Sequence, residues 1–111
     1  MTPVAAIDVK ELRRRLEAEG PKPYLLDVRE PWEYMAGHVP GALLIPLGEL
    51  EQRVGEVPRD REVLAICHSG QRSLAAAGYL QQLGYPTVSN VDGGTAAWIE
   101  RGYPTDSSSA S

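Results

Sequence analysis

The stretch that decides the fold of this chain is Val63-Leu64-Ala65-Ile66-Cys67-His68-Ser69-Gly70-Gln71-Arg72-Ser73. Its first four residues form an apolar run that is too short for a helix and is typical of a strand buried on both faces. The polar residues that follow predict a loop. The Ala- and Leu-rich residues 73–83 then predict a helix, which Gly84 ends. A strand, a loop and a helix therefore follow one another, with the chain's single cysteine at the start of the loop.

Similar units on either side extend this pattern. Residues 24–28, 42–45 and 87–91 are further short apolar runs that predict strands. Residues 9–19 and 95–101 predict helices, and helical turns are expected after Pro31 and Leu47. This alternation predicts one α/β domain with a mainly parallel central sheet of about five strands, flanked by helices. Ligands of such sheets bind beyond the carboxyl ends of the strands, here after Val28, Ile66 and Val91.

Length and composition limit the function classes. The 111 residues suit a single domain, predicted over residues 1–104, with a disordered Ser-rich tail over residues 105–111. Acidic residues outnumber basic ones by 15 to 11, which argues against a nucleic-acid partner. The sequence shows neither an apolar run of about 18 residues nor a signal peptide, so we expect no membrane contact and a cytoplasmic location.

Cys67 is the candidate nucleophile. Amides at a helix N-terminus stabilise a thiolate, and such settings lower a thiol pKa from ~8.5 to ~3.5–7.5. Arg72 is expected to bind an anionic substrate and to support the thiolate. A free cysteine is more often a buried small hydrophobe, but the polar neighbours of Cys67 favour reactivity. One cysteine and two histidines predict neither a disulfide nor a metal site, and no cofactor is expected.

The loop from Cys67 to Ser73 resembles the active-site loop of the rhodanese (thiosulfate sulfurtransferase) family, whose pattern is Cys-x-x-Gly-x-Arg-Ser. Three further segments resemble the family in the same order. They are the buried strand Leu26-Asp27-Val28-Arg29, the turn Gly37-His38-Val39-Pro40-Gly41-Ala42, and Val91-Asp92-Gly93-Gly94 followed by Trp98. The resemblance spans residues 8–103, and the length is that of the single-domain members.

The resemblance implies sulfur transfer through a Cys67 persulfide. A donor such as thiosulfate would supply the sulfur, and cyanide, a small thiol or a protein thiol would accept it. The implied binding loop consists of His68, Ser69, Gly70, Gln71, Arg72 and Ser73. His68 replaces an arginine that is often found at that family position, which is expected to weaken thiosulfate binding. Because no second cysteine is present, the acceptor must come from outside the chain.

Other polar and aromatic residues receive more modest roles. Asp27 interrupts a buried strand and needs a partner, so Asp27 and Arg29 are predicted either to brace the active-site region or to form a plain structural ion pair. His38 is predicted to make structural hydrogen bonds. Trp32 and Trp98 are predicted to fill the core.

Two other functions stay open. The first is a small cysteine-dependent phosphatase or arsenate reductase. It is disfavoured because four residues separate Cys67 from Arg72, whereas related phosphatases have five and so a wider loop. The second is a non-catalytic sulfur carrier or interaction module, against which the intact Cys67 and Arg72 argue.

Overall fold

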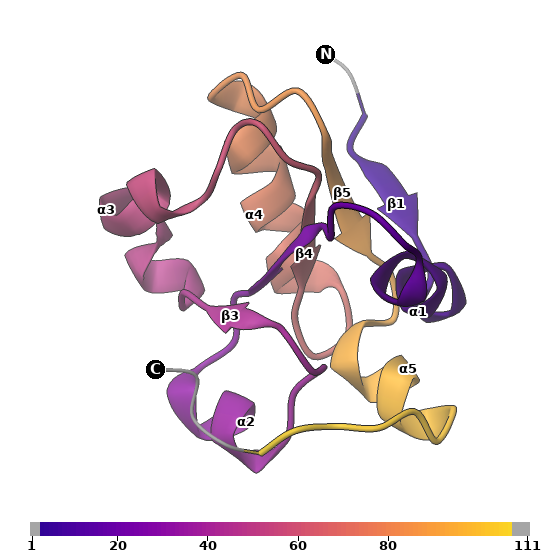
Figure 1. Ribbon diagram of the computed structural model, residues 1–111. Coiled ribbons are helices and arrows are strands. Elements are labelled where there is room, and N and C mark those ends of the chain that lie inside the picture. The colour runs from indigo at the N-terminus through magenta and orange to yellow at the C-terminus, as the bar shows by residue number, and fades with distance from the viewer. Residues whose placement is uncertain (1–2, 108–111) are drawn as a thin grey trace.

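The computed structural model describes residues 3–107 and shows a single five-stranded parallel sheet with the strand order β1-β5-β4-β2-β3 (Figure 1). The predicted α/β architecture is therefore confirmed. The strands are β1 (Ala5–Ile7), β2 (Tyr24–Asp27), β3 (Leu43–Leu44), β4 (Val63–Ile66) and β5 (Val88–Val91). The strand β4 lies in the centre of the sheet. Cys67, the residue that follows β4, therefore lies midway along the line formed by the carboxyl ends of the strands.

The connections between strands are short helices. They are α1 (Val9–Glu17), α2 (Pro31–Ala36), α3 (Leu50–Arg53) and α4 (Gln71–Gln82), with 3₁₀ turns η1 (Leu47–Glu49) and η2 (Val54–Glu56) on either side of α3. A further helix, α5 (Gly94–Glu100), follows the last strand. None of the helices within residues 3–107 is both long and apolar enough to cross a bilayer.

Local chemistry explains where the helices begin. The Asp8 side chain accepts a hydrogen bond of 2.8 Å from the Glu11 amide and so caps α1. Pro31 occupies the first turn of α2, where a missing N–H costs nothing. The helix α4 begins at Gln71, two residues earlier than predicted, because Gly70 adopts a φ of 108° that turns the chain sharply into the helix.

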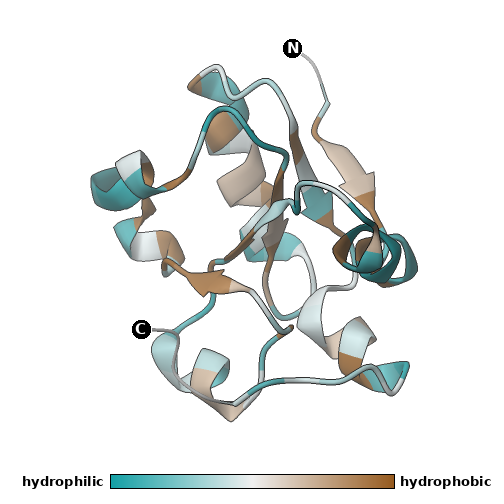
Figure 2. Ribbon diagram, viewed as in Figure 1, coloured by the Kyte–Doolittle hydropathy of each residue, from teal (hydrophilic) through white to brown (hydrophobic). Residues whose placement is uncertain are grey.

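The core forms two layers, one on each face of the sheet. Leu26, Val63 and Cys67 pack with Ala76 and Leu80 of α4 on one face. On the other face lie alternate residues of the same strands together with α1 and α5, as represented by Leu25, Leu64, Leu12 and Trp98. Strand β3 is brown in Figure 2, whereas α1 is mostly teal because it is rich in charged residues.

The structure differs from the sequence prediction at several elements. The strand β1 was not among the predicted strands, because Ala5-Ala6 carries little apolar signal and the strand forms by pairing with β5. Only two residues of the predicted strand at 42–45 pair with β2. Trp98 is buried as predicted. Trp32 is 73% exposed, so its predicted place in the core is wrong.

The C-terminal boundary also needs a correction. The amide and carbonyl of Asp106 each form a 2.8 Å hydrogen bond with the backbone of His38. Asp106 is therefore part of the folded domain, whereas the prediction placed it in a disordered tail. Residues 108–111 of that tail lie outside the described residues.

Candidate active site

The Cys67 thiol lies at the carboxyl end of β4, inside the turn that leads into α4. The Gly70 amide donates a hydrogen bond of 3.1 Å to Cys67 Sγ, and the Ser73 hydroxyl donates one of 3.3 Å. The first donor lies in the tight loop that the positive φ of Gly70 makes possible, and the second lies in the first turn of α4. Of the N–H groups that the sequence predicts around the sulfur, that of Gly70 therefore donates to it directly.

Burial and hydrogen bonding act on this thiol in opposite directions. Only 1% of the Cys67 surface is exposed, and this burial, the largest single influence, raises the thiol pKa. The Ser73 hydroxyl and the amides of Ser73, Gly70 and Ser69 together outweigh it, and the pKa of Cys67 is lowered. The site therefore favours a thiolate although the sulfur is almost fully enclosed.

Two segments, the first turn of α5 and the strand β5, donate hydrogen bonds that hold the cysteine loop in place. The Thr95 amide donates to the Cys67 carbonyl at 2.8 Å, and the Ala96 amide donates to the His68 carbonyl at 2.9 Å. The Asn90 side-chain amide donates to the Gly70 carbonyl at 3.1 Å. These bonds attach the loop to the first turn of α5 and to β5.

Gly94 is the residue that permits this close approach. A Cβ atom on Gly94 would lie 2.5 Å from the carbonyl oxygens of both Cys67 and His68. No role for Gly94, Thr95 or Asn90 was predicted from the sequence. The adjacent pair Gly93-Gly94 was the available signal, since two glycines at a strand–helix turn indicate close backbone packing.

The hydrogen bonds of the Arg72 side chain go to α2 and not to the thiol. Its guanidinium forms a bidentate pair with the Glu33 carboxylate of α2, with N–O distances of 2.7 and 2.9 Å. Arg72 lowers the pKa of Glu33 to about 2, and Glu33 in turn raises the pKa of Arg72. The negative charge nearest to this arginine is thus supplied by the protein itself, and its predicted role in substrate binding stays a prediction.

Asp27 and Arg29 form the buried ion pair that the sequence predicts. Arg29 donates to both oxygens of Asp27, at distances from 2.9 to 3.1 Å, and also to the carbonyls of Glu33 and Gly37. The pair therefore fixes α2 and the turn after it. It reaches the cysteine loop only indirectly, because α2 carries Glu33, which binds Arg72.

The two histidines are in different surroundings. His38 is buried, stacks on Tyr34 and bonds to its carbonyl at 2.7 Å, consistent with the predicted structural role. His68 is exposed, as are Ser69 and Gln71 of the predicted binding loop. Within residues 3–107, no group of three or more His, Cys, Asp and Glu side chains is placed to hold a metal ion.

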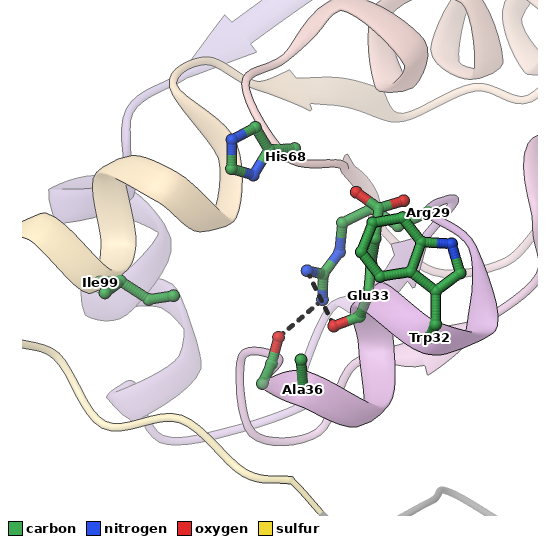
Figure 3. A pocket seen from close by; sticks show the side chains of 7 residues that line it. Arg29, Trp32, Glu33, Ala36, His68 and Ile99 are labelled. Atoms are coloured by element: carbon green, nitrogen blue, oxygen red, sulfur yellow. Dashed lines mark hydrogen bonds between the residues drawn. The ribbon is translucent and has the colours of Figure 1, made fainter.

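A pocket of about 400 Å³ opens beside the cysteine loop, between α2 and α5 (Figure 3). His68 and Ile99 lie on one side of it, and Trp32 and Ala36 lie on the other. Arg29, Glu33 and Gly37 complete its lining.

Comparison with known proteins places this geometry in a family. The family model described as the rhodanese-like domain matches residues 8–101. A sulfurtransferase from Allochromatium vinosum is 42% identical over 101 residues, which cover 91% of this chain and 94% of the relative. A Bacillus subtilis protein named as a candidate sulfur carrier protein is 46% identical over 74 residues, or 67% of this chain and 40% of that protein.

Solved structures agree with these sequence matches. The crystal structure of a rhodanese-related protein from Thermoplasma volcanium superimposes with a TM-score of 0.85 at 36% identity. The match covers 94% of this chain and 99% of that protein.

Proposed function

This chain belongs to the rhodanese-like domain family, and from that premise we propose that it transfers sulfane sulfur from a donor to a thiophilic acceptor through a persulfide on Cys67. The observation that carries the proposal is the pair of hydrogen bonds from the Gly70 amide and the Ser73 hydroxyl to Sγ. These donors stabilise a thiolate, the form of cysteine that acts as a nucleophile.

The proposed reaction has two half-reactions. The Cys67 thiolate attacks the outer sulfur of a donor such as thiosulfate, the sulfur–sulfur bond of the donor breaks, and sulfite leaves with the bonding electrons. The acceptor then attacks the outer sulfur of the Cys67 persulfide and restores the thiolate. Cyanide leaves as thiocyanate, and a thiolate acceptor leaves as its own persulfide. Such a covalent route predicts ping-pong kinetics.

The loop residues stabilise the anion at each stage. A persulfide, like a thiolate, carries a negative charge, so a fixed set of N–H and O–H donors stabilises both forms without rearranging. In the resting state, the amides of Ser69, Gly70 and Ser73 lower the pKa of Cys67 and so oppose the effect of burial. We propose that the same amides bind the terminal sulfur of the persulfide.

The enclosure of the sulfur sets a condition on this mechanism. Because Cys67 is 1% exposed, a donor reaches Sγ only when neighbouring side chains or part of the loop move aside. We assign Arg72 to the entrance, where release from Glu33 would free its guanidinium for an anionic substrate. The acceptor is a small thiol, cyanide or a protein thiol, and the proposed setting is the reducing cytoplasm.

Intact-protein mass spectrometry after incubation with thiosulfate tests the proposal. We expect a gain of about 32 Da, one sulfur atom, that cyanide or dithiothreitol removes. The matched control is Cys67→Ser, which replaces the sulfur with oxygen and is expected to show no adduct. If neither thiosulfate nor an organic persulfide adds sulfur to the wild-type protein, sulfur transfer by Cys67 is wrong.

Assays of the same two proteins, wild type and Cys67→Ser, distinguish sulfur transfer from the phosphatase and sulfur-carrier alternatives. Release of phosphate from a phosphoester by the wild-type protein, lost in Cys67→Ser, would support a phosphatase instead. Formation of the adduct without steady turnover would indicate a sulfur carrier, a function that the name of the Bacillus subtilis relative describes for that protein.

A further inference from the structure

The pocket between α2 and α5 is larger than thiosulfate or cyanide requires. Its volume is about 400 Å³, within the range of roughly 300–1,000 Å³ that is typical of clefts for organic small molecules. His68, the residue that follows Cys67 in the chain, lines this pocket, and so does Glu33, whose carboxylate binds Arg72. The pocket is therefore adjacent to the entrance of the proposed active site.

Much of this wall is apolar and accessible. Trp32 is 73% exposed and Ile99 is 53% exposed, and Ala36 lies between them at the base of the pocket (Figure 3). Large apolar side chains exposed together around a concavity mark a binding site more often than a solvent-facing surface. The fold gives no other reason for the exposure of Trp32, because the core forms without it.

The charges of this region oppose a dianion. The guanidinium of Arg29 lines the pocket but binds the Asp27 carboxylate, and the guanidinium of Arg72 binds Glu33. Thiosulfate carries two negative charges and would have to displace the Glu33 carboxylate from Arg72. A donor with one negative charge and an apolar group has less repulsion to overcome and can bury that group against Trp32.

We propose that this pocket binds the organic group of a sulfane donor, so that this chain uses monoanionic organic donors, with a group up to the size of an aromatic ring, in preference to thiosulfate. The proposal rests on the proposed function, because it assigns a substrate class to the same cysteine. Trp32 contacts the organic group, and Glu33 disfavours the dianion through its pair with Arg72.

The proposed reaction can be written out for one monoanionic organic donor, benzenethiosulfonate. The Cys67 thiolate attacks the outer sulfur of benzenethiosulfonate, C₆H₅–SO₂–S⁻. The sulfur–sulfur bond of the donor breaks, benzenesulfinate leaves with the electron pair, and the Cys67 persulfide anion remains. Two negative charges are present before and after the step, and no proton or external oxidant is needed.

Three donors separate the contribution of charge from that of the apolar group. Benzenethiosulfonate and methanethiosulfonate carry the same single charge and differ in the organic group, whereas thiosulfate replaces that group with a charged oxygen. Rates of Cys67 persulfide formation are measured by mass spectrometry and divided by the rates of the same donors with N-acetylcysteine. We expect the normalised rates to fall in the order benzenethiosulfonate, methanethiosulfonate, thiosulfate, with at least about fivefold between the first two.

Variants then test the residues. Trp32→Ala is expected to lower the benzenethiosulfonate rate about fivefold and to leave the methanethiosulfonate rate within about twofold. Met35→Ala is the matched control, because Met35 is an exposed apolar residue of the same helix that does not line the pocket. Glu33→Gln retains a hydrogen-bonding side chain and is expected to raise the thiosulfate rate more than the methanethiosulfonate rate.

The outcomes distinguish the two proposals. If the wild-type protein forms no Cys67 persulfide with any donor, the proposed function fails and this inference fails with it. If the persulfide forms but thiosulfate is the preferred donor, or if Trp32→Ala changes the two thiosulfonates equally, only the inference is overturned. An equal loss in Trp32→Ala and Met35→Ala would indicate a general effect of truncating side chains of α2, and it would overturn the assignment of the organic group to Trp32.

Discussion

The Cys67 thiol combines almost complete burial with a lowered pKa, and the Ser73 hydroxyl makes the largest contribution to the lowering. A hydrogen bond to a charged group contributes about 1.5–3 kcal/mol, and one pKa unit corresponds to about 1.4 kcal/mol. A single donor side chain can therefore lower the pKa of the thiol appreciably.

Ser73→Ala removes that donor and leaves the amides in place. We expect the thiol pKa to rise, because desolvation is then opposed by the backbone alone. The rate of alkylation by iodoacetamide follows the thiolate fraction, so its midpoint shifts to higher pH by the same amount. Ser69→Ala is the control, because Ser69 acts on the thiol through its amide. An unchanged midpoint in Ser73→Ala would show that the hydroxyl does not stabilise the thiolate.

Side-chain pairings show how far the sequence predicts single residues. Asp27 and Arg29 lie two positions apart, so the sequence was sufficient to predict their buried pair. Glu33 and Arg72 are 39 residues apart and meet only because the fold brings α2 within side-chain reach of the start of α4, which composition does not reveal. Trp32 was placed wrongly because its apolar character does not indicate which way a short helix faces.

At the scale of the elements, α5 holds the cysteine loop in place through hydrogen bonds. Its first turn donates two amides to the carbonyls of Cys67 and His68, and Gly94 allows the backbones to approach. The glycine serves two requirements at once, because its φ is 59° and a Cβ atom would overlap the loop.

Gly94→Ala is expected to destabilise the domain by several kcal/mol, measured as the free energy of unfolding in urea. A left-handed backbone costs a non-glycine residue about 1–2 kcal/mol, and displacement of the loop adds to this cost. Gly102→Ala isolates the first contribution, because Gly102 has a φ of 77° and open space around its Cα. Equal losses in the two variants would contradict a role for close packing at Gly94.

Elements with strong local signals were predicted and the others were not. The continuous apolar run of β4 and the Ala-rich α4 both predict their own structure from composition. The strand β1 consists of two alanines and an isoleucine, and it is a strand because the edge of β5 is available for pairing. Edge elements of this kind depend on their neighbours, and so a single sequence predicts them poorly.

At the scale of the whole molecule, the C-terminal segment links parts of the chain that are far apart. Asp106 pairs with His38 through two backbone hydrogen bonds, and the Pro104 carbonyl accepts a bond of 2.7 Å from the Trp98 indole. The first contact lies next to the turn that Arg29 also holds, and the second lies against the helix that carries the loop contacts. The segment thus crosses beneath α2 and α5 and connects the two elements that border the pocket (Figure 1).

Two truncations test whether this segment belongs to the folded domain. A chain that ends at Pro104 loses both bonds between Asp106 and His38, whereas a chain that ends at Ser107 retains them. A typical backbone bond contributes about 0.5–1.5 kcal/mol net, so we expect the shorter chain to be less stable by about 1–3 kcal/mol in urea unfolding. We also expect faster amide exchange at His38 in the shorter chain, because its N–H loses its acceptor. Equal stability and equal exchange in the two chains would mean that the domain ends at Pro104, as composition alone suggests.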